Sequence, residues 1–478
     1  TVLRCFPSFQ DFSHVTFVKA EQLWILEMSI ADPSAFHHRG HYGSVNEGSH
    51  DNEGMSLLQL GSLDSSDDLY SKEAGSGWVG AALNLTSSIV GAGCIGLGGA
   101  IAHSGGIVSL FALTGVAILS KYSFDLVIDL ALASGQPQPS YESLGFATYG
   151  DVGKFVVALS KGLYSSGCLV AYIVIIKDNF ASAIAHMLFG GDNVDNELGP
   201  WQTFLTNQYS VTVFICTTVM LPLCMMRDVS PLERFSALKI SVVILIVVIV
   251  VYLFFTTEKV QPTGSFADHW LVVHTGVFES LGTFIFTFVA QHSIHLVYQS
   301  IKRSQRKNFR KTTSLGTVLS TMISMFMGFY VYMTFWENTS SSMFQLYSPS
   351  KAIDVCRILL CTSMLLTYPF PFFTVRELLV LLYFNPHRTS WLLPEDERQL
   401  QQKYHVALTI CIWFITLLLA LAASSLGVVL NLTGCVTGTV IAYILPAVFS
   451  YKLRGHTIIG SVLFLIGGSV GLVGTYYS

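Results

Sequence analysis

The sequence has little charge. Only 12% of its residues are Asp, Glu, Lys or Arg, whereas a soluble globular chain carries about 25%. The formal net charge of −4 leaves no basic excess for nucleic acid. Hydrophobic residues make up 51% of the chain, and apolar runs of roughly 20 residues recur from Trp78 to the C-terminus. We therefore expect an all-α polytopic membrane protein whose partner is a lipid bilayer and not a nucleic acid.

The sequence also lacks the patterns of an enzyme. None of its nine cysteines has metal-ligand spacing, and no loop carries a nucleophile–base pair or a phosphate-binding motif. The segment Gly91–Gly96 matches the letters GxGxxG, but no strand precedes it and no acidic residue follows at the required distance. We predict no catalytic residue, no bound metal beyond a sodium ion, and no cofactor other than a coupling ion.

Two regions follow from the hydropathy pattern. Residues 1–77 are polar and end in a stretch rich in Gly, Ser and acid, which predicts a disordered acidic tail. Residues 78–478 form the membrane domain, with eleven predicted spans. They cover roughly 78–101, 105–132, 154–189, 209–226, 240–257, 275–299, 313–336, 352–383, 404–423, 427–449 and 456–477.

The distribution of lysine and arginine predicts the orientation. If the tail is cytoplasmic, the cytoplasmic loops collect most of the basic residues, and the outer loops hold only Lys177, Lys259 and Lys351. The glycosylation sequon at Asn338 then falls in an outer loop, in agreement with this assignment. We expect a cytoplasmic N-terminus and a plasma, vacuolar or lysosomal membrane.

The first span is unusual for a membrane helix. Five of the nine residues from Gly91 to Gly99 are glycine, and a polar run (Asn84, Thr86, Ser87, Ser88) precedes them. Ala92, Gly96 and Ala100 form a small-residue stripe that helix packing alone explains, but the other glycines and the polar run are not explained this way. We predict an unwound segment in the middle of the membrane, where amides bind a substrate carboxylate and oxygens bind a cation.

Two further spans carry polar residues at depth. The sixth contains Gln291 and His292, and the imidazole is suited to carry a proton because its ordinary pKa is about 6.5. No glycine or proline lies next to Gln291 and His292 that would break the helix there. The eighth contains Thr367, directly before Tyr368-Pro-Phe-Pro371, and its hydroxyl is a candidate sodium ligand.

Four motifs occur in the order found in one known family. The run Asn84-Leu-Thr-Ser-Ser-Ile-Val-Gly-Ala-Gly-Cys-Ile-Gly-Leu resembles the first span of the sodium-coupled neutral amino acid transporters of the amino acid/auxin permease superfamily. Segments 221–228, 286–292 and 366–377 are similar to the family's fourth, sixth and eighth spans. The resemblance covers about residues 78 to 455.

This resemblance implies a LeuT-like fold, with two inverted five-helix repeats plus one extra helix, and symport of a neutral amino acid such as glutamine, alanine or asparagine. It places the substrate carboxylate at Gly91 to Gly93 and a sodium ligand at Thr367. Two positions depart from the family pattern. The sodium-binding asparagine of the first span falls on Ser87, and the Cys-His pair of the sixth falls on Ala290 and Gln291, with the histidine displaced to His292. Sodium coupling, proton coupling and uniport therefore stay open.

We predict a monomeric secondary active transporter of neutral L-amino acids that works by alternating access. An amino acid sensor that signals through its tail is the alternative. The predicted substrate-binding residues are Ser88, Gly91, Ala92, Gly93, Ser165, Phe288, Gln291 and His292, with Tyr164 and Ser166 as further wall candidates. The predicted ion-binding residues are Asn84, Ser87 and Thr367, and the predicted glycosylation site is Asn338.

Overall fold

A computed structural model describes residues 75–136, 140–189, 199–226, 236–257, 269–384 and 402–477 of the chain. Within these ranges the regular structure is helical, apart from one isolated β-bridge. The predicted tail, residues 1–77, lies outside the described residues except for its last three positions.

The helices follow the predicted order of spans. The first five spans are α3 (Trp78–Ile89) with α4 (Ala92–Ser104), α5 (Gly106–Ala133), α6 (Tyr141–Phe189), α8 (Gln208–Ile215) with η3 (Cys216–Met220) and α9 (Leu221–Met225), and α11 (Ser236–Thr256). The next six are α13 (Val277–Phe288) with η4 (Gln291–Ser293) and α14 (Ile294–Ser300), α15 (Phe309–Phe335), α16 (Lys351–Thr367) with α17 (Pro369–Phe384), α18 (Gln402–Ala422), α19 (Leu426–Thr433) leading through η9 (Gly434–Gly438) and η10 (Val440–Ile444) to α20 (Leu445–Arg454), and α21 (Ile458–Tyr477).

The predicted number of spans agrees with the helices. In the described part of the chain, ten helices are long and apolar enough to cross a bilayer, and α3 and α4 form an eleventh span that bends by 57° at a short break. Most boundaries differ from the predicted ones by a few residues, as expected where helix ends are read from hydropathy alone. The exception is α6, which begins at Tyr141, well before the predicted start at 154, because a first arm precedes its kink at Tyr149 and Gly150.

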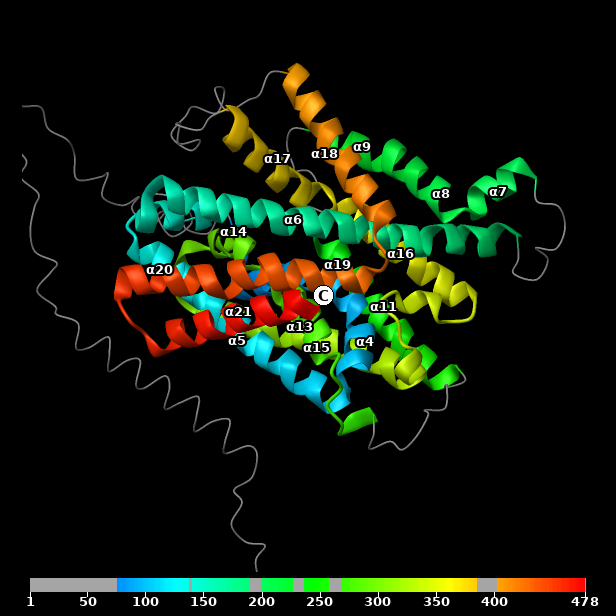
Figure 1. Cartoon of the computed structure of the whole chain (residues 1–478), viewed down its shortest axis with the longest axis horizontal. Helices are drawn as coiled ribbons and strands as arrows, with labels where there is room; N and C mark the ends of the chain where they lie inside the picture. The colour runs from blue at the N-terminus through cyan, green and yellow to red at the C-terminus, as the bar shows by residue number, and fades with distance from the viewer. Residues whose placement is uncertain are drawn as a thin grey trace, which may run out of the picture. The chain divides into compact units, whose positions relative to one another are not determined.

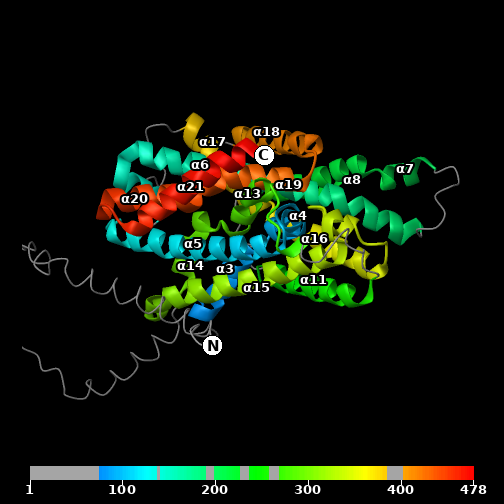
Figure 2. The same ribbon diagram turned by 60° about the horizontal axis from the view of Figure 1, so that its bottom comes forward.

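Two long helices organise the packing. α6 lies against α8, α16, α17, α18 and α19, and Figure 1 shows it running between α8, α9, α17 and α18 on one side and α19, α20 and α21 on the other. α15 packs against α3, α4, α5 and α11, and Figure 2 shows it alongside α3 and α5. α4 lies between these two groups, and Ala92 to Ile101 are all buried.

The two ends of the first span are held differently. Before α3, the Ser76 amide donates to the Ser300 carbonyl (2.8 Å) and the Lys302 amide donates back to the Ser76 carbonyl (3.1 Å). These bonds join the start of α3 to the end of α14. At the far end, the α15–α16 loop covers α4, since the Ser341 side chain accepts from the Gly427 amide (3.0 Å) and Ser342 donates to Asp178 of α6.

Candidate functional site

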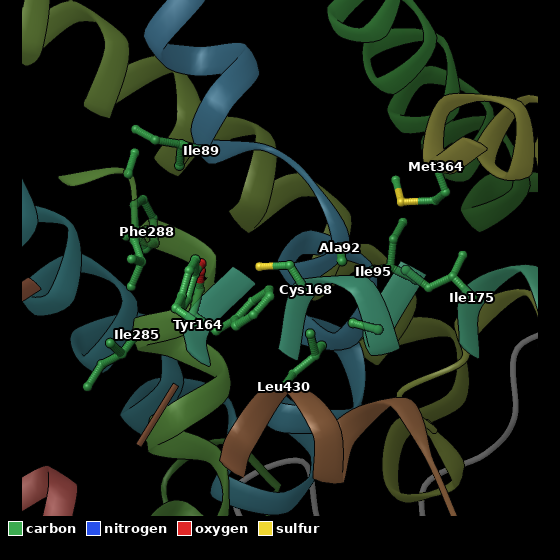
Figure 3. Close-up of a cluster of buried hydrophobic side chains, with 14 of the residues drawn as sticks. Ile89, Ala92, Ile95, Tyr164, Cys168, Ile175, Ile285, Phe288, Met364 and Leu430 are labelled. Atoms are coloured by element: carbon green, nitrogen blue, oxygen red, sulfur yellow. The ribbon is translucent and has the colours of Figure 1, made fainter. Parts of the chain in front are cut away.

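The first span breaks at Val90 and Gly91. Val90 has an extended backbone (φ −80°, ψ 101°), Gly91 is also non-helical (φ −149°, ψ −140°), and α4 begins at Ala92. Figure 3 shows the extended connection between Ile89 and Ala92. A Cβ atom on Gly91 would meet no atom within 4 Å, so open space lies beside the break. The predicted unwound segment is present, but it covers two residues instead of the whole glycine run.

The other glycines of the run are helical and serve close packing. A Cβ atom on Gly93 would lie 2.7 Å from Thr287 Cα, one on Gly96 would lie 2.4 Å from Leu430, and one on Gly99 would lie 2.7 Å from the Ser341 amide nitrogen. The packing role predicted for Gly96 is present, and the expectation that packing does not explain the other glycines is wrong for positions 93 and 99. The three glycines let α13, α19 and the α15–α16 loop approach α4.

The sixth span breaks in the same way without a glycine or proline. α13 ends at Phe288, Val289 has an extended backbone (φ −75°, ψ 104°), and Ala290 (φ −133°, ψ 10°) precedes the single turn η4. The dihedral angles of Val289 are within a few degrees of those of Val90. The two spans therefore have matching interruptions, one in each half of the membrane domain.

The two breaks lie side by side with opposite helix ends. The contact of Gly93 with Thr287 brings the first turn of α4 next to the last turn of α13. No side chain caps α4, and the first amides of a helix have no intrahelical acceptor. The last carbonyls of α13 likewise lack intrahelical donors. An N-terminal end favours anions and a C-terminal end favours cations, so the pair matches a zwitterion.

The residues after the second break carry unpaired nitrogen atoms. Gln291 is fully buried, and its Oε1 accepts from the Ala290 amide (3.1 Å). Its Nε2 has no hydrogen-bond partner among the described residues, and neither has Nδ1 of the half-buried His292. Buried polar atoms are nearly always paired. Both predicted residues therefore present vacant hydrogen-bonding atoms at the end of the second break.

α6 provides the wall beside the breaks. Tyr164 is buried, its hydroxyl donates to the Phe286 carbonyl (3.3 Å), and its ring lies 5.5 Å from that of His292. Figure 3 places Tyr164 close to Phe288, which is fully buried. Ser165 is buried one position further along α6. Tyr164 thus stabilises the free end of α13.

The predicted ion-binding residues Asn84 and Ser87 and the predicted substrate-binding residue Ser88 lie on the more accessible side of α3. Asn84 and Ser88 are exposed, Ser87 is half-buried, and the Ser88 hydroxyl donates to the Asn84 carbonyl (3.0 Å). The opposite side of α3 is buried. The first span is therefore accessible along α3 and beside Gly91. In contrast, α4 is covered by the α15–α16 loop.

Three other predicted residues have defined positions. Thr367 ends α16, is half-buried and donates to the Ser363 carbonyl (2.7 Å). Asn338 is exposed in η6 (Trp336–Asn338) of the α15–α16 loop, where a sugar could be attached. Lys177 differs from expectation. It lies within α6 and donates to the Ala420 and Ala423 carbonyls (both 3.2 Å), so it caps the end of α18 and is not a loop residue.

Sequence comparisons identify related proteins. Residues 74–463 match the family described as "Transmembrane amino acid transporter protein". The chain is 26% identical over 402 residues to a protein of Rattus norvegicus named "Putative sodium-coupled neutral amino acid transporter 11", with 82% of this chain and 83% of the relative covered. It is 25% identical over 370 residues to vacuolar amino acid transporter 2 of Saccharomyces cerevisiae, with 76% and 74% covered.

A solved structure has the same fold. Mhp1, a nucleobase-cation-symport-1 family transporter solved in a closed conformation with bromovinylhydantoin bound, matches with a TM-score of 0.52 and 13% identity. The match covers 84% of this chain and 90% of that chain. The predicted LeuT-like fold is thereby confirmed. The residues that sequence reasoning did not connect are Thr287, which Gly93 contacts, and Val289, where the second break begins.

Proposed function

The chain belongs to the transmembrane amino acid transporter family, and we propose that it is a symporter that moves neutral L-amino acids such as alanine or glutamine by alternating access. The protein is an integral membrane transporter and not an enzyme. The observation that carries the proposal is the pair of adjacent helix breaks at Val90–Gly91 and Val289–Ala290. Broken helices of this kind provide binding sites at the midplane of transporters.

The geometry supports a zwitterionic substrate. In the proposal, the amides of Ala92 and Gly93 donate to the carboxylate, and the last carbonyls of α13 accept from the ammonium group. The side chain of the amino acid then extends into the open space beside Gly91. Gln291 Nε2, which has no partner among the described residues, supplies a further donor to the carboxylate.

The uneven covering of the first span supports an inward-facing state. The α15–α16 loop covers α4, whereas Asn84 and Ser88 of α3 are exposed. With the N-terminus in the cytoplasm, the site opens toward the cytoplasm and is closed on the outside. Alternating access then requires α3 and α14 to move together, because backbone hydrogen bonds join their ends.

The coupling ion is sodium or a proton, and the membrane is the plasma membrane or a vacuolar or lysosomal one. For sodium, the candidate ligands are the side-chain oxygens of Asn84, Ser87 and Thr367. The relatives named as a sodium-coupled transporter and as a vacuolar transporter are compatible with either choice.

Uptake by purified protein tests this function. Proteoliposomes are supplied with radiolabelled alanine, glutamine or arginine, while a sodium gradient and a pH gradient are imposed separately. We expect saturable uptake of alanine or glutamine that exceeds arginine uptake and responds to one of the gradients. If no amino acid enters saturably under either gradient, the protein does not have this function.

A further inference from the structure

A cluster of ionisable side chains lies beside the second break, apart from the residues proposed above to bind the substrate. It consists of Glu142 and Lys161, which form an ion pair, and His295 of α14. His295 is 5% exposed, and neither of its ring nitrogens has a hydrogen-bond partner among the described residues. A buried imidazole normally pairs at least one nitrogen. Because both nitrogens lack a partner in the described protein, His295 is a candidate to bind a proton or another small ligand.

The ion pair connects two arms of a kinked helix. α6 is interrupted at Tyr149 and Gly150 (φ 62° at the glycine), so Glu142 lies before the kink and Lys161 after it. The two arms cross where a Cβ atom on Gly145 would lie 2.6 Å from the Gly153 carbonyl oxygen. The Glu142–Lys161 pair thus holds the short first arm against the long membrane arm.

His295 touches the first arm directly. Its ring lies edge-on to the ring of Tyr141, with 5.9 Å between the centroids, and Tyr141 precedes Glu142 in the chain. The Tyr141 hydroxyl donates to the Ile441 carbonyl in η10 (Val440–Ile444) (2.7 Å). A charge on His295 would therefore act on a junction of α6, α14 and the tenth span.

Few other charged groups face this histidine. Glu142 attracts a proton on His295 and Lys161 repels it, and His292 lies on the same turn of the sixth span. Among the elements packed against α14, α3 (Trp78–Ile89) has no titratable side chain. The acidic groups of α5 are already paired, Asp125 with Lys121 (2.9 Å) and Asp129 with Arg310 (3.3 Å). Glu377 of α17 acts on Lys161.

We propose that His295 binds the coupling proton, with Glu142 as the counter-charge that it shares with Lys161. This inference rests on the proposed amino acid transport. A neutral His295 takes one proton from water on one side of the membrane and becomes an imidazolium, so Glu142 lies between two cations. Release of the same proton to the other side restores the Glu142–Lys161 pair alone, which is the described arrangement.

The chemistry of the cluster favours a proton over a metal ion. Its one carboxylate is already neutralised by an ammonium group, and the remaining vacant atoms are imidazole nitrogens. Imidazole is the side chain whose ordinary pKa, about 6.5, lies closest to physiological pH, so it is the common proton carrier in proteins. A metal cation would find no uncompensated negative charge among these three side chains, because Lys161 already neutralises the one carboxylate.

The test compares net uptake with exchange. Proteoliposomes containing the full chain or its His295→Gln variant are loaded with unlabelled alanine to measure exchange without a gradient. The same proteins are then tested for accumulation under an inwardly directed proton gradient without sodium. His274→Gln, which removes an exposed histidine before α13, is the control.

We expect the wild-type protein and His274→Gln to exchange alanine and to accumulate it under the proton gradient. His295→Gln should keep exchange within about twofold but lose accumulation. If His295→Gln accumulates alanine like the wild type, or if only a sodium gradient drives the wild type, the inference is wrong while the transport function stands. If the wild type does not exchange any amino acid, the proposed function itself fails.

If His295→Gln does not insert into the membrane, a second variant tests the same inference. Lys161→Met removes the repelling cation and leaves Glu142 to His295 alone. Protonation of His295 then needs a lower proton concentration, so the pH of half-maximal driven uptake should rise by about one unit. A pH profile identical to that of the wild type would contradict a proton site at His295.

Discussion

A Cβ atom on Gly93 would lie 2.7 Å from both the Cα and the Oγ1 atoms of Thr287. The nearest backbone atom belongs to α13, so a rotamer change at Thr287 cannot relieve the contact. We predict that Gly93→Ala separates α4 from α13, lowers stability by about 1–3 kcal/mol and abolishes uptake. Thermal unfolding in detergent and alanine uptake measure the two effects.

The matched control for this substitution is Gly468→Ala on α21, where an added Cβ atom would meet nothing within 4 Å. It should leave both the unfolding temperature and uptake unchanged. Wild-type stability and uptake in Gly93→Ala would show that the close contact between the two breaks is not needed.

The open space beside Gly91 leads to a different prediction for a substitution at Gly91 than for one at Gly93. A methyl group at Gly91 clashes with nothing, so Gly91→Ala should fold normally but occupy part of the substrate space. We expect the KM for alanine to rise about tenfold, the effect of a methyl group in a tight pocket. Gly115→Ala on α5 also adds a methyl group to open space and should keep the wild-type KM. Equal KM values in the two variants would place the substrate elsewhere.

The first break was predictable because its cause is local. A glycine run after a polar run is incompatible with an ordinary membrane helix, and the span number follows from hydropathy. The close packing of Gly93 and Gly99 was not predictable, because it depends on neighbours far away in the sequence. The second break was not predictable from the sequence, for another reason. Val289 and Ala290 favour no interruption by themselves, and the extended backbone there depends on its tertiary surroundings.

The ion pair of Glu142 with Lys161 was equally hidden. The two residues are 19 positions apart, which is too far for a contact along a straight helix. The kink at Tyr149 and Gly150 brings them together. Glycines at 145, 150 and 153 are the sequence signal of this kink, but glycine in a helical pattern is equally compatible with close packing in an unbroken helix.

A substitution at Tyr164 should loosen the C-terminal end of α13 and leave the overall fold intact. Tyr164→Phe removes the hydrogen bond to the Phe286 carbonyl, a loss of about 1 kcal/mol, and we expect slower uptake with normal insertion. Tyr332→Phe is the control, because its hydroxyl donates to a backbone carbonyl away from the breaks, that of His269 (3.1 Å). A decrease in uptake that is as large in Tyr332→Phe would argue against a specific role for Tyr164.

Thr367 provides a test of sodium binding. Thr367→Ala removes a hydroxyl that bonds to its own helix, so stability should change little. If this oxygen binds sodium, the sodium concentration for half-maximal uptake rises severalfold, and Thr374→Ala on α17, which removes a similarly bonded hydroxyl, leaves it unchanged. An unaltered sodium response in Thr367→Ala removes this residue from the ion site.

Glycosylation at Asn338 reports the orientation of the chain. This exposed side chain lies in the α15–α16 loop, which we place on the outer side. We predict that enzymatic removal of N-linked sugars lowers the apparent mass of the wild-type protein expressed in eukaryotic cells, and that Asn338→Gln has the lower mass without treatment. Equal masses of all samples would leave the orientation without this support.

The central claim is that the two adjacent breaks bind the carboxylate of an amino acid. The most direct test measures inhibition of labelled alanine exchange by unlabelled L-alanine and by L-alaninamide, which has the same shape without the negative charge. We predict that L-alanine inhibits with an affinity close to its KM and that the amide is at least about tenfold weaker, since it loses a charge-assisted hydrogen bond. Equal inhibition by the two compounds would contradict carboxylate binding at the α4 terminus.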